Sequence, residues 1–192
     1  MDARVHRLQG EAEGVTSPTP PTSTTPTAGA PSAPTQRALL QDAYRDRLAL
    51  MNRHVEGATR MADYEFNNTY QYVIGREEIH VQWLRDALID LGAEVPATAP
   101  VLAVPEGKGV AGERAILEDD LRAGRAFVDK WRARLGDVRN ARHRRLLDVI
   151  IGEVSEQTRF FELALAGRDD LLGTRMPGAS TGDGVLPVRW MT

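Results

Sequence analysis

The sequence contains no cysteine. This absence excludes disulfide bonds, zinc–thiolate sites, iron–sulfur clusters and thiol nucleophiles. Any metal that the protein binds must therefore be held by carboxylate oxygens and imidazole nitrogens. The chain has 27 Asp and Glu residues and 4 His residues that can supply such ligands.

Long apolar runs and an excess of basic charge are also missing. No uninterrupted apolar stretch is long enough to cross a membrane, and the polar residues 1–14 lead into no apolar segment of the kind found in secretion signals. The 24 basic and 27 acidic residues give a formal net charge of -3 and are spread along the chain. We therefore expect a cytoplasmic protein that binds neither membranes nor nucleic acid.

Composition divides the chain into a tail, a helical domain and a second tail. Residues 15–35 are almost entirely Thr, Pro, Ser, Ala and Gly, a composition that buries too little apolar surface to fold. We therefore predict a disordered N-terminal tail over residues 1–35. Long stretches rich in Ala, Leu, Arg and Glu then predict an all-α domain over residues 36–168, followed by an irregular C-terminal tail over residues 169–192.

Breaks in the helical pattern predict four helices. The first stretch, residues 36–92, is too long for one globular helix, and Asn67 and Asn68 in the sequence YEFNNTY favour a turn within it. The prolines and glycines of residues 92–112 predict a long connection across the bundle. The third and fourth helices are then expected at about residues 112–135 and 141–167.

The predicted inner faces of three helices carry ionisable side chains. In the second helix, steps of three and four residues give an apolar seam interrupted by Glu77 and His80. The same phase places Glu153 and Glu156 in the seam of the fourth helix, and the third helix carries Asp120 on its inner face. Residues three positions apart in a helix point the same way, so each of the two pairs can act as a chelate.

The other residues of these faces complete the prediction of the core: Tyr70, Val73, Leu84, Ala87 and Leu91 in the second helix, and Ile116, Leu117, Gly124, Phe127 and Trp131 in the third. The fourth helix is expected to bury Leu146, Val149, Phe160 and Leu163. The first helix is expected to bury Leu48, Met51, Val55, Ala58 and Ala62, a face without a carboxylate.

A cluster of buried carboxylates needs compensation. An unpaired buried carboxylate costs several kcal/mol, and neighbouring carboxylates also repel one another. Three kinds of compensation are open: arginines that reach in from Arg76, Arg125 or Arg159, raised pKa values that leave some acids protonated, or a bound cation. Helical bundles are known to hold metal ions in this way.

Residues 36–168 resemble the ferritin-like di-iron carboxylate superfamily, which includes bacterioferritin and rubrerythrin. The resemblance rests on Glu77 and His80 in the sequence REEIH, which match the Glu-x-x-His pair of that family's second helix. Asp120 lies 33 residues before Glu153, close to the family's separation between the third-helix acid and the fourth-helix motif. At the position of the family's second His, this chain has Glu156.

The resemblance implies a fold, a cofactor and a class of chemistry. The fold is an antiparallel four-helix bundle with a long crossover between the second and third helices. The implied metal ligands are Glu77, His80, Asp120, Glu153 and Glu156, which would bind iron, with manganese as another candidate metal. Such a site reacts with dioxygen or peroxide, as in oxidases, peroxidases and iron-oxidising proteins. Ferritin-like bundles also assemble as homodimers or larger homo-oligomers.

The first helix does not complete this ligand set. The family's first-helix acid falls on Tyr44 here, and His54 or Glu56 would come closer to Glu77 if the turn lies at Asn67. A second hypothesis follows from the missing acid: a helical module that has lost its metal and acts as an adaptor or cargo protein through its tails.

The C-terminal tail ends in the apolar sequence GVLPVRWMT, residues 184–192. Apolar clusters of this kind are unusual at a free terminus. Either this segment packs against its own bundle, which we favour, or it docks onto a protein partner.

Overall fold

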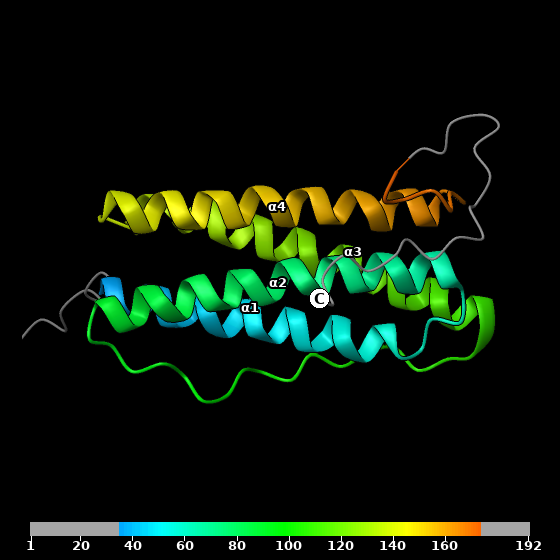
Figure 1. Ribbon diagram of the computed structural model, residues 1–192, viewed down its shortest axis with the longest axis horizontal. Coiled ribbons are helices and arrows are strands. Elements are labelled where there is room, and N and C mark those ends of the chain that lie inside the picture. The colour runs from blue at the N-terminus through cyan, green and yellow to red at the C-terminus, as the bar shows by residue number, and fades with distance from the viewer. Residues whose placement is uncertain (1–34, 174–192) are drawn as a thin grey trace, which may run out of the picture. The chain divides into compact units, whose positions relative to one another are not determined.

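The computed structural model describes residues 35–173, which form four α-helices (Figure 1). These are α1 (Gln36–Ala58), α2 (Tyr64–Asp90), α3 (Gly109–Arg134) and α4 (Ala141–Leu165), and a short 3-10 helix, η1 (Leu135–Asp137), follows α3. No β-strand occurs within the described residues, so the predicted all-α fold with four helices is confirmed. Most of the two predicted tails, residues 1–34 of the first and 174–192 of the second, lies outside the described part of the chain.

Side-chain caps and glycines set the ends of the helices. Thr35, Asp63 and Asn140 precede α1, α2 and α4, and each accepts a hydrogen bond from a backbone N–H in the first helical turn. Gly92 and Gly167 follow α2 and α4 with φ angles of 59° and 83°. Glycine adopts this left-handed conformation without steric cost, which allows the chain to leave the helix.

The turn between α1 and α2 lies earlier than predicted, at residues 59–63. Asp63 ends the turn because its carboxylate caps α2, accepting a hydrogen bond from the Phe66 N–H at 3.0 Å. Asn67, which was expected in the turn, lies inside α2. Its side-chain amide donates to the Ala58 carbonyl at 3.0 Å, at the end of α1. The asparagine therefore joins two helix ends instead of forming the turn.

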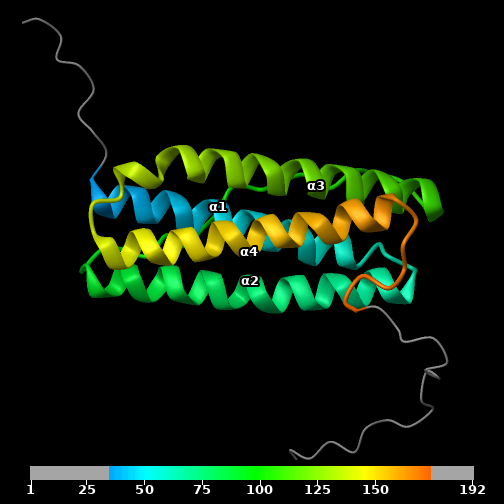
Figure 2. The ribbon, with the colours of Figure 1, turned by 90° about the horizontal axis from the view of Figure 1, so that it is seen from above.

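The helices lie side by side as two pairs (Figure 1, Figure 2). α1 packs mainly against α2 and α3 mainly against α4, with fewer contacts between α1 and α3 and between α2 and α4. The connection from α2 to α3, residues 91–108, has neither helix nor strand and runs along α1. Arg53 of α1 and Arg60 of the following turn hold it by donating to the carbonyls of Ala103 and Pro105. The predicted long connection is confirmed.

Two apolar clusters form the core, and a layer of polar side chains lies between them. The larger cluster includes Leu40, Leu84, Trp131 and Leu147, and the smaller one includes Tyr70, Ile116 and Phe161. Ten polar or charged residues are buried in the described part of the chain, and most of them occupy intermediate positions along the helices. They are Arg47, Arg53, His54, Thr69, Glu77, His80, Asp120, His143, Gln157 and Thr158.

The predicted inner face is correct for α2 and α3, whereas it is wrong for α4 and, apart from the buried Ala58, for α1. α4 buries the neighbouring stripe, whose members are Leu147, Ile150, Val154, Gln157, Phe161 and Ala164. Both stripes have helical spacing, and the buried one is the more apolar apart from Gln157. In α1, Val55 is 45% exposed, whereas Arg47, Arg53 and His54 are buried. The apolar residues of α1 therefore indicate the wrong face, because three positions of the buried face hold ionisable residues.

None of the helices in the described part of the chain is both long and apolar enough to span a membrane.

Gly124 provides a test of the packing between α3 and α4. A Cβ atom at this position would lie 2.7 Å from Thr158 Cγ2. We therefore expect Gly124→Ala to lower the free energy of unfolding by about 1–3 kcal/mol, measured by chemical denaturation. In a Thr158→Ser background, which removes Cγ2, the same substitution should stabilise the protein because alanine favours the helix by up to about 1 kcal/mol. Gly75→Ala is the matched control, since nothing lies within 4 Å of its added Cβ.

Candidate functional site

Glu77 lies at the centre of the polar layer and is fully buried. Its Oε1 atom lies 2.9 Å from Nη1 of Arg47, an ion pair without hydrogen-bond geometry. Nδ1 of His54 lies 2.9 Å from Oε1 and 3.0 Å from Oε2. Both oxygens of this predicted metal ligand are therefore in contact with a cationic or hydrogen-bonding side chain of α1.

His80, one turn further along α2, uses both of its ring nitrogens. Nδ1 accepts from the Arg47 guanidinium, with Nη2 at 3.1 Å and Nε at 3.3 Å. Nε2 lies 2.9 Å from Oε2 of Glu153. An imidazole that accepts at Nδ1 and donates from Nε2 is neutral, so this geometry fits His80 in its uncharged form.

Asp120 on α3 has a separate set of partners. Arg53 Nε donates to Oδ1 at 2.5 Å, and the Tyr70 hydroxyl donates to Oδ2. Nε2 of His54 lies 3.9 Å from Oδ1, which links Asp120 to Glu77 through the two sides of one imidazole ring. Arg53 also forms an ion pair with the neighbouring Asp119.

The two acids predicted from α4 lie in different environments. The Glu153 side chain is 29% exposed and accepts from Arg76 Nη2, which lies 2.6 Å from Oε1. The Glu156 side chain is 68% exposed and pairs with Arg159 at 3.2 Å. The structure therefore brings Glu77, His80, Asp120 and Glu153 into one network and leaves Glu156 on the surface.

Each buried or half-buried carboxylate of this network has its own arginine. Arg47 pairs with Glu77, Arg53 with Asp120 and Arg76 with Glu153. Of the three arginines suggested by the sequence, only Arg76 reaches the network, since Arg125 pairs with the exposed Glu162 and Arg159 with Glu156. Arg47 and Arg53 were missed because they lie on the face of α1 that a search for apolar residues passes over.

Electrostatics keep Glu77 ionised. Burial by itself raises the pKa of a carboxyl group, but the opposite charges of His54 and Arg47 outweigh it and hold the pKa of Glu77 below its usual value. For His54, burial opposes protonation, but Glu77 and then Asp120 raise its pKa above the usual value. The Tyr70 hydroxyl stays protonated because burial and Asp120 raise its pKa.

The pKa of His80 shifts in the opposite direction to that of His54. Burial and the adjacent positive charge of Arg47 lower its pKa to about 4, and the attraction of Glu153 offsets only part of this effect. At neutral pH the protein thus holds a neutral imidazole between a guanidinium and a carboxylate, which agrees with the hydrogen bonds of its two nitrogens.

This shift predicts a loss of stability in mild acid. The folded-state pKa of His80 is about 4, whereas the unfolded value is about 6.5. The unfolded chain therefore binds the proton first, and the free energy of unfolding should fall by about 3 kcal/mol as the pH drops from about 6.5 to about 4. Chemical denaturation at several pH values measures this slope. A His80→Gln variant should lack that part of the slope, and an unchanged slope in the variant would contradict the assignment.

The residues of the network do not fit the di-iron site that the ferritin-like resemblance implies. Such a site needs carboxylate oxygens and an imidazole nitrogen that are free to bind metal. Here Arg47 contacts both Glu77 and His80, and internal donors contact both oxygens of Asp120. Across residues 35–173, no group of three or more His, Cys, Asp or Glu side chains is arranged to hold a metal ion.

The three residues of the first helix that could complete the metal ligand set, Tyr44, His54 and Glu56, lie in different environments. His54 contacts Glu77, as described above. Tyr44 is buried in the larger apolar cluster, and Glu56 is exposed and pairs with Arg60 at 2.7 Å. The residue of α1 that meets Glu77 and His80 together is Arg47. No local pattern in the sequence identifies this arginine, because its partners lie 30 and 33 residues away in the chain.

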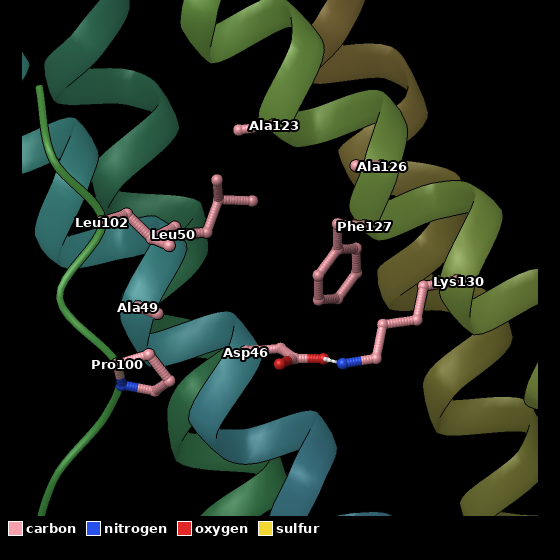
Figure 3. A pocket seen from close by; sticks show the side chains of 9 residues that line it. All are labelled: Asp46, Ala49, Leu50, Pro100, Leu102, Ala123, Ala126, Phe127 and Lys130. Carbon is pink, nitrogen blue, oxygen red and sulfur yellow. Dashed lines mark ion pairs between the residues drawn. The ribbon is translucent and has the colours of Figure 1, made fainter. Parts of the chain in front are cut away.

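A small apolar pocket of about 180 Å³ lies between α1 and α3 (Figure 3). Leu50 and Phe127 line it, and Pro100 and Leu102 of the long connection lie along its edge. Its polar groups, Asp46 and Lys130, form an ion pair at 2.6 Å and leave no unpaired charge for a ligand (Figure 3). We assign no binding role to this pocket.

Comparison of the chain with protein-family models, with curated proteins and with solved structures gives no match.

Proposed function

We propose that this protein is a ferritin-like antiparallel bundle in which internal arginines have taken the place of a metal, and that it acts as a non-catalytic interaction module. The observation that carries the proposal is the position of Arg47, whose guanidinium contacts Glu77, His80 and the Gln157 carbonyl oxygen, Oε1. A cation that is part of the chain thus occupies the place at which the family's ligands would converge on iron.

The charges of the network support the same proposal. A metal would have to displace three guanidinium groups, of which those of Arg47 and Arg53 are almost completely buried. Removing a carboxylate from a buried ion pair leaves the arginine uncompensated, at a cost of about 3–5 kcal/mol. Metal binding would therefore have to offset the loss of an existing, charge-balanced structure.

An interaction role is the function that remains for such a core. The polar layer fixes the register of the four helices, since its ion pairs join different helices: Arg47 of α1 with Glu77 of α2, Arg53 of α1 with Asp120 of α3, and Arg76 of α2 with Glu153 of α4. This gives a rigid scaffold from which surfaces and tails can be presented. The alternative that the resemblance implies is an iron-dependent reaction with dioxygen or peroxide. This reaction requires carboxylate and imidazole ligands that are not already paired with internal donors.

Metal content and chelator response test the proposal. We expect the purified protein to contain far less than one iron, manganese or zinc per chain by elemental analysis. Its midpoint of thermal unfolding should be the same with and without EDTA, because no metal contributes to the folded state. Close to two irons per chain, together with a midpoint that falls in EDTA, would refute the proposal and make a di-iron oxidase or peroxidase the better explanation.

A further inference from the structure

The furrow between α2 and α4 is less covered than the opposite side of the bundle. On that opposite side, Pro100 and Leu102 of the long connection lie against α1 and α3. On α2, Tyr72, Ile79 and Trp83 follow one another at helical spacing and are 50%, 38% and 36% exposed. Large side chains exposed in a row on one helix are typical of a face that another segment covers.

Two recesses lie along this furrow. The first has a volume of about 370 Å³, and its apolar lining includes Trp83, Ala87, Leu146 and Val149. The second has a volume of about 280 Å³ and is lined by Tyr72, Arg76, Glu153, Glu156, Gln157 and Phe160. Their centres are about eleven residues apart along α4, or about 16 Å at the helical rise per residue.

We propose that the apolar C-terminal segment of this chain, residues 184–192, occupies this furrow, with Trp190 in the recess beside Trp83 and Leu186 in the recess beside Phe160. This goes beyond the proposed function, because it concerns the surface of the bundle and does not depend on whether the core binds a metal.

The described part of the chain ends within reach of the furrow. After α4 the chain turns toward α2 at the end of the bundle that holds the smaller apolar cluster (Figure 2), and Leu171 is buried in that cluster with Phe161. Leu186 is the thirteenth residue after Gly173, a reach of about 40 Å when extended. The nearer recess lies only about two to three helical turns from the end of α4, or about 14 Å. The segment is therefore more than long enough.

The sequence of the segment matches the furrow. In an extended conformation alternate side chains share a face, which places Leu186, Val188 and Trp190 on one side and Arg189 on the other. The step from Leu186 to Trp190 spans about 13 Å in that conformation, close to the spacing of the two recesses. Residues 174–183 contain Gly, Ser, Thr and Pro, a composition that suits a connecting segment.

The lack of cysteine makes a direct test simple. The variant Asp86→Cys/Met191→Cys places one thiol at the edge of the larger recess and one next to Trp190. The control Asp129→Cys/Met191→Cys places the first thiol on an exposed position of α3 instead. Both full-length variants are oxidised in dilute solution and analysed by mass spectrometry and non-reducing electrophoresis.

We expect an intramolecular disulfide in the Asp86 variant and little in the Asp129 control. Adding Trp190→Ser to the Asp86 variant should slow the crosslink by about tenfold or more, because the anchoring side chain is lost. Equal crosslinking of the two pairs, or none in either, would overturn the proposal. Disulfide-linked dimers as the main product of the Asp86 pair would also overturn it and would assign the furrow to a second copy.

Discussion

Replacing Arg47 with methionine is expected to lower the free energy of unfolding by about 3–5 kcal/mol. Methionine retains much of the length of the side chain but removes the charge. Glu77 would then be left buried with His54 as its remaining partner, and Nδ1 of His80 would lose its donor. This loss is large compared with the total stability of about 5–15 kcal/mol that is common for folded proteins. Chemical denaturation with circular dichroism detection measures it.

A double-mutant cycle shows whether the effect comes from the ion pair. In the variant Arg47→Met/Glu77→Gln, most of the lost stability should return, because no uncompensated charge is left in the core. Arg45→Met is the matched control, since the exposed pair that Arg45 forms with Asp42 should contribute less than about 1 kcal/mol. A loss no larger in Arg47→Met than in Arg45→Met would contradict the buried ion pair.

Replacing Arg47 with glutamate is expected to make the stability of the protein depend on metal. The substitution exchanges the internal cation for a carboxylate beside Glu77 and His80. In EDTA the variant should be less stable than Arg47→Met, because two buried carboxylates then repel each other. Added Zn²⁺ or Co²⁺ should restore stability by about 3 kcal/mol at a concentration a hundred times the dissociation constant. Thermal unfolding with and without metal measures the effect.

Two variants separate metal binding at this site from adventitious binding. Arg47→Gln, which has no charge, should show no stabilisation by metal. Arg47→Glu/His80→Ala should lose most of the stabilisation because it lacks the imidazole ligand. A lack of response to metal in Arg47→Glu would mean that Arg53 and Arg76 are sufficient to exclude a metal ion. The idea that Arg47 alone takes the place of the metal would then be wrong.

The sequence by itself determined the class of the fold and the buried faces of two helices. Helical spacing identified Glu77, His80 and Asp120 as interruptions of apolar faces, and all three are fully buried. This worked because α2 and α3 carry one clear apolar stripe each, in which a charged residue stands out. The long connection was also predictable, since the prolines and glycines of residues 92–112 cannot continue a helix.

The tertiary structure alone decided what compensates these charges. Arg47 and Arg53 lie in α1, which has seven Arg, Asp and Glu residues along its length, so local periodicity does not mark these two arginines as buried. Their partners, Glu77 and Asp120, are 30 and 67 residues away in the chain, and the pairing depends on which faces of four helices meet. Likewise, α4 has two neighbouring stripes of helical spacing, and only packing against α3 selects the one that leaves Glu156 exposed. The sequence could predict that buried carboxylates need a cation, whereas only the packed bundle could show that the cation is an arginine.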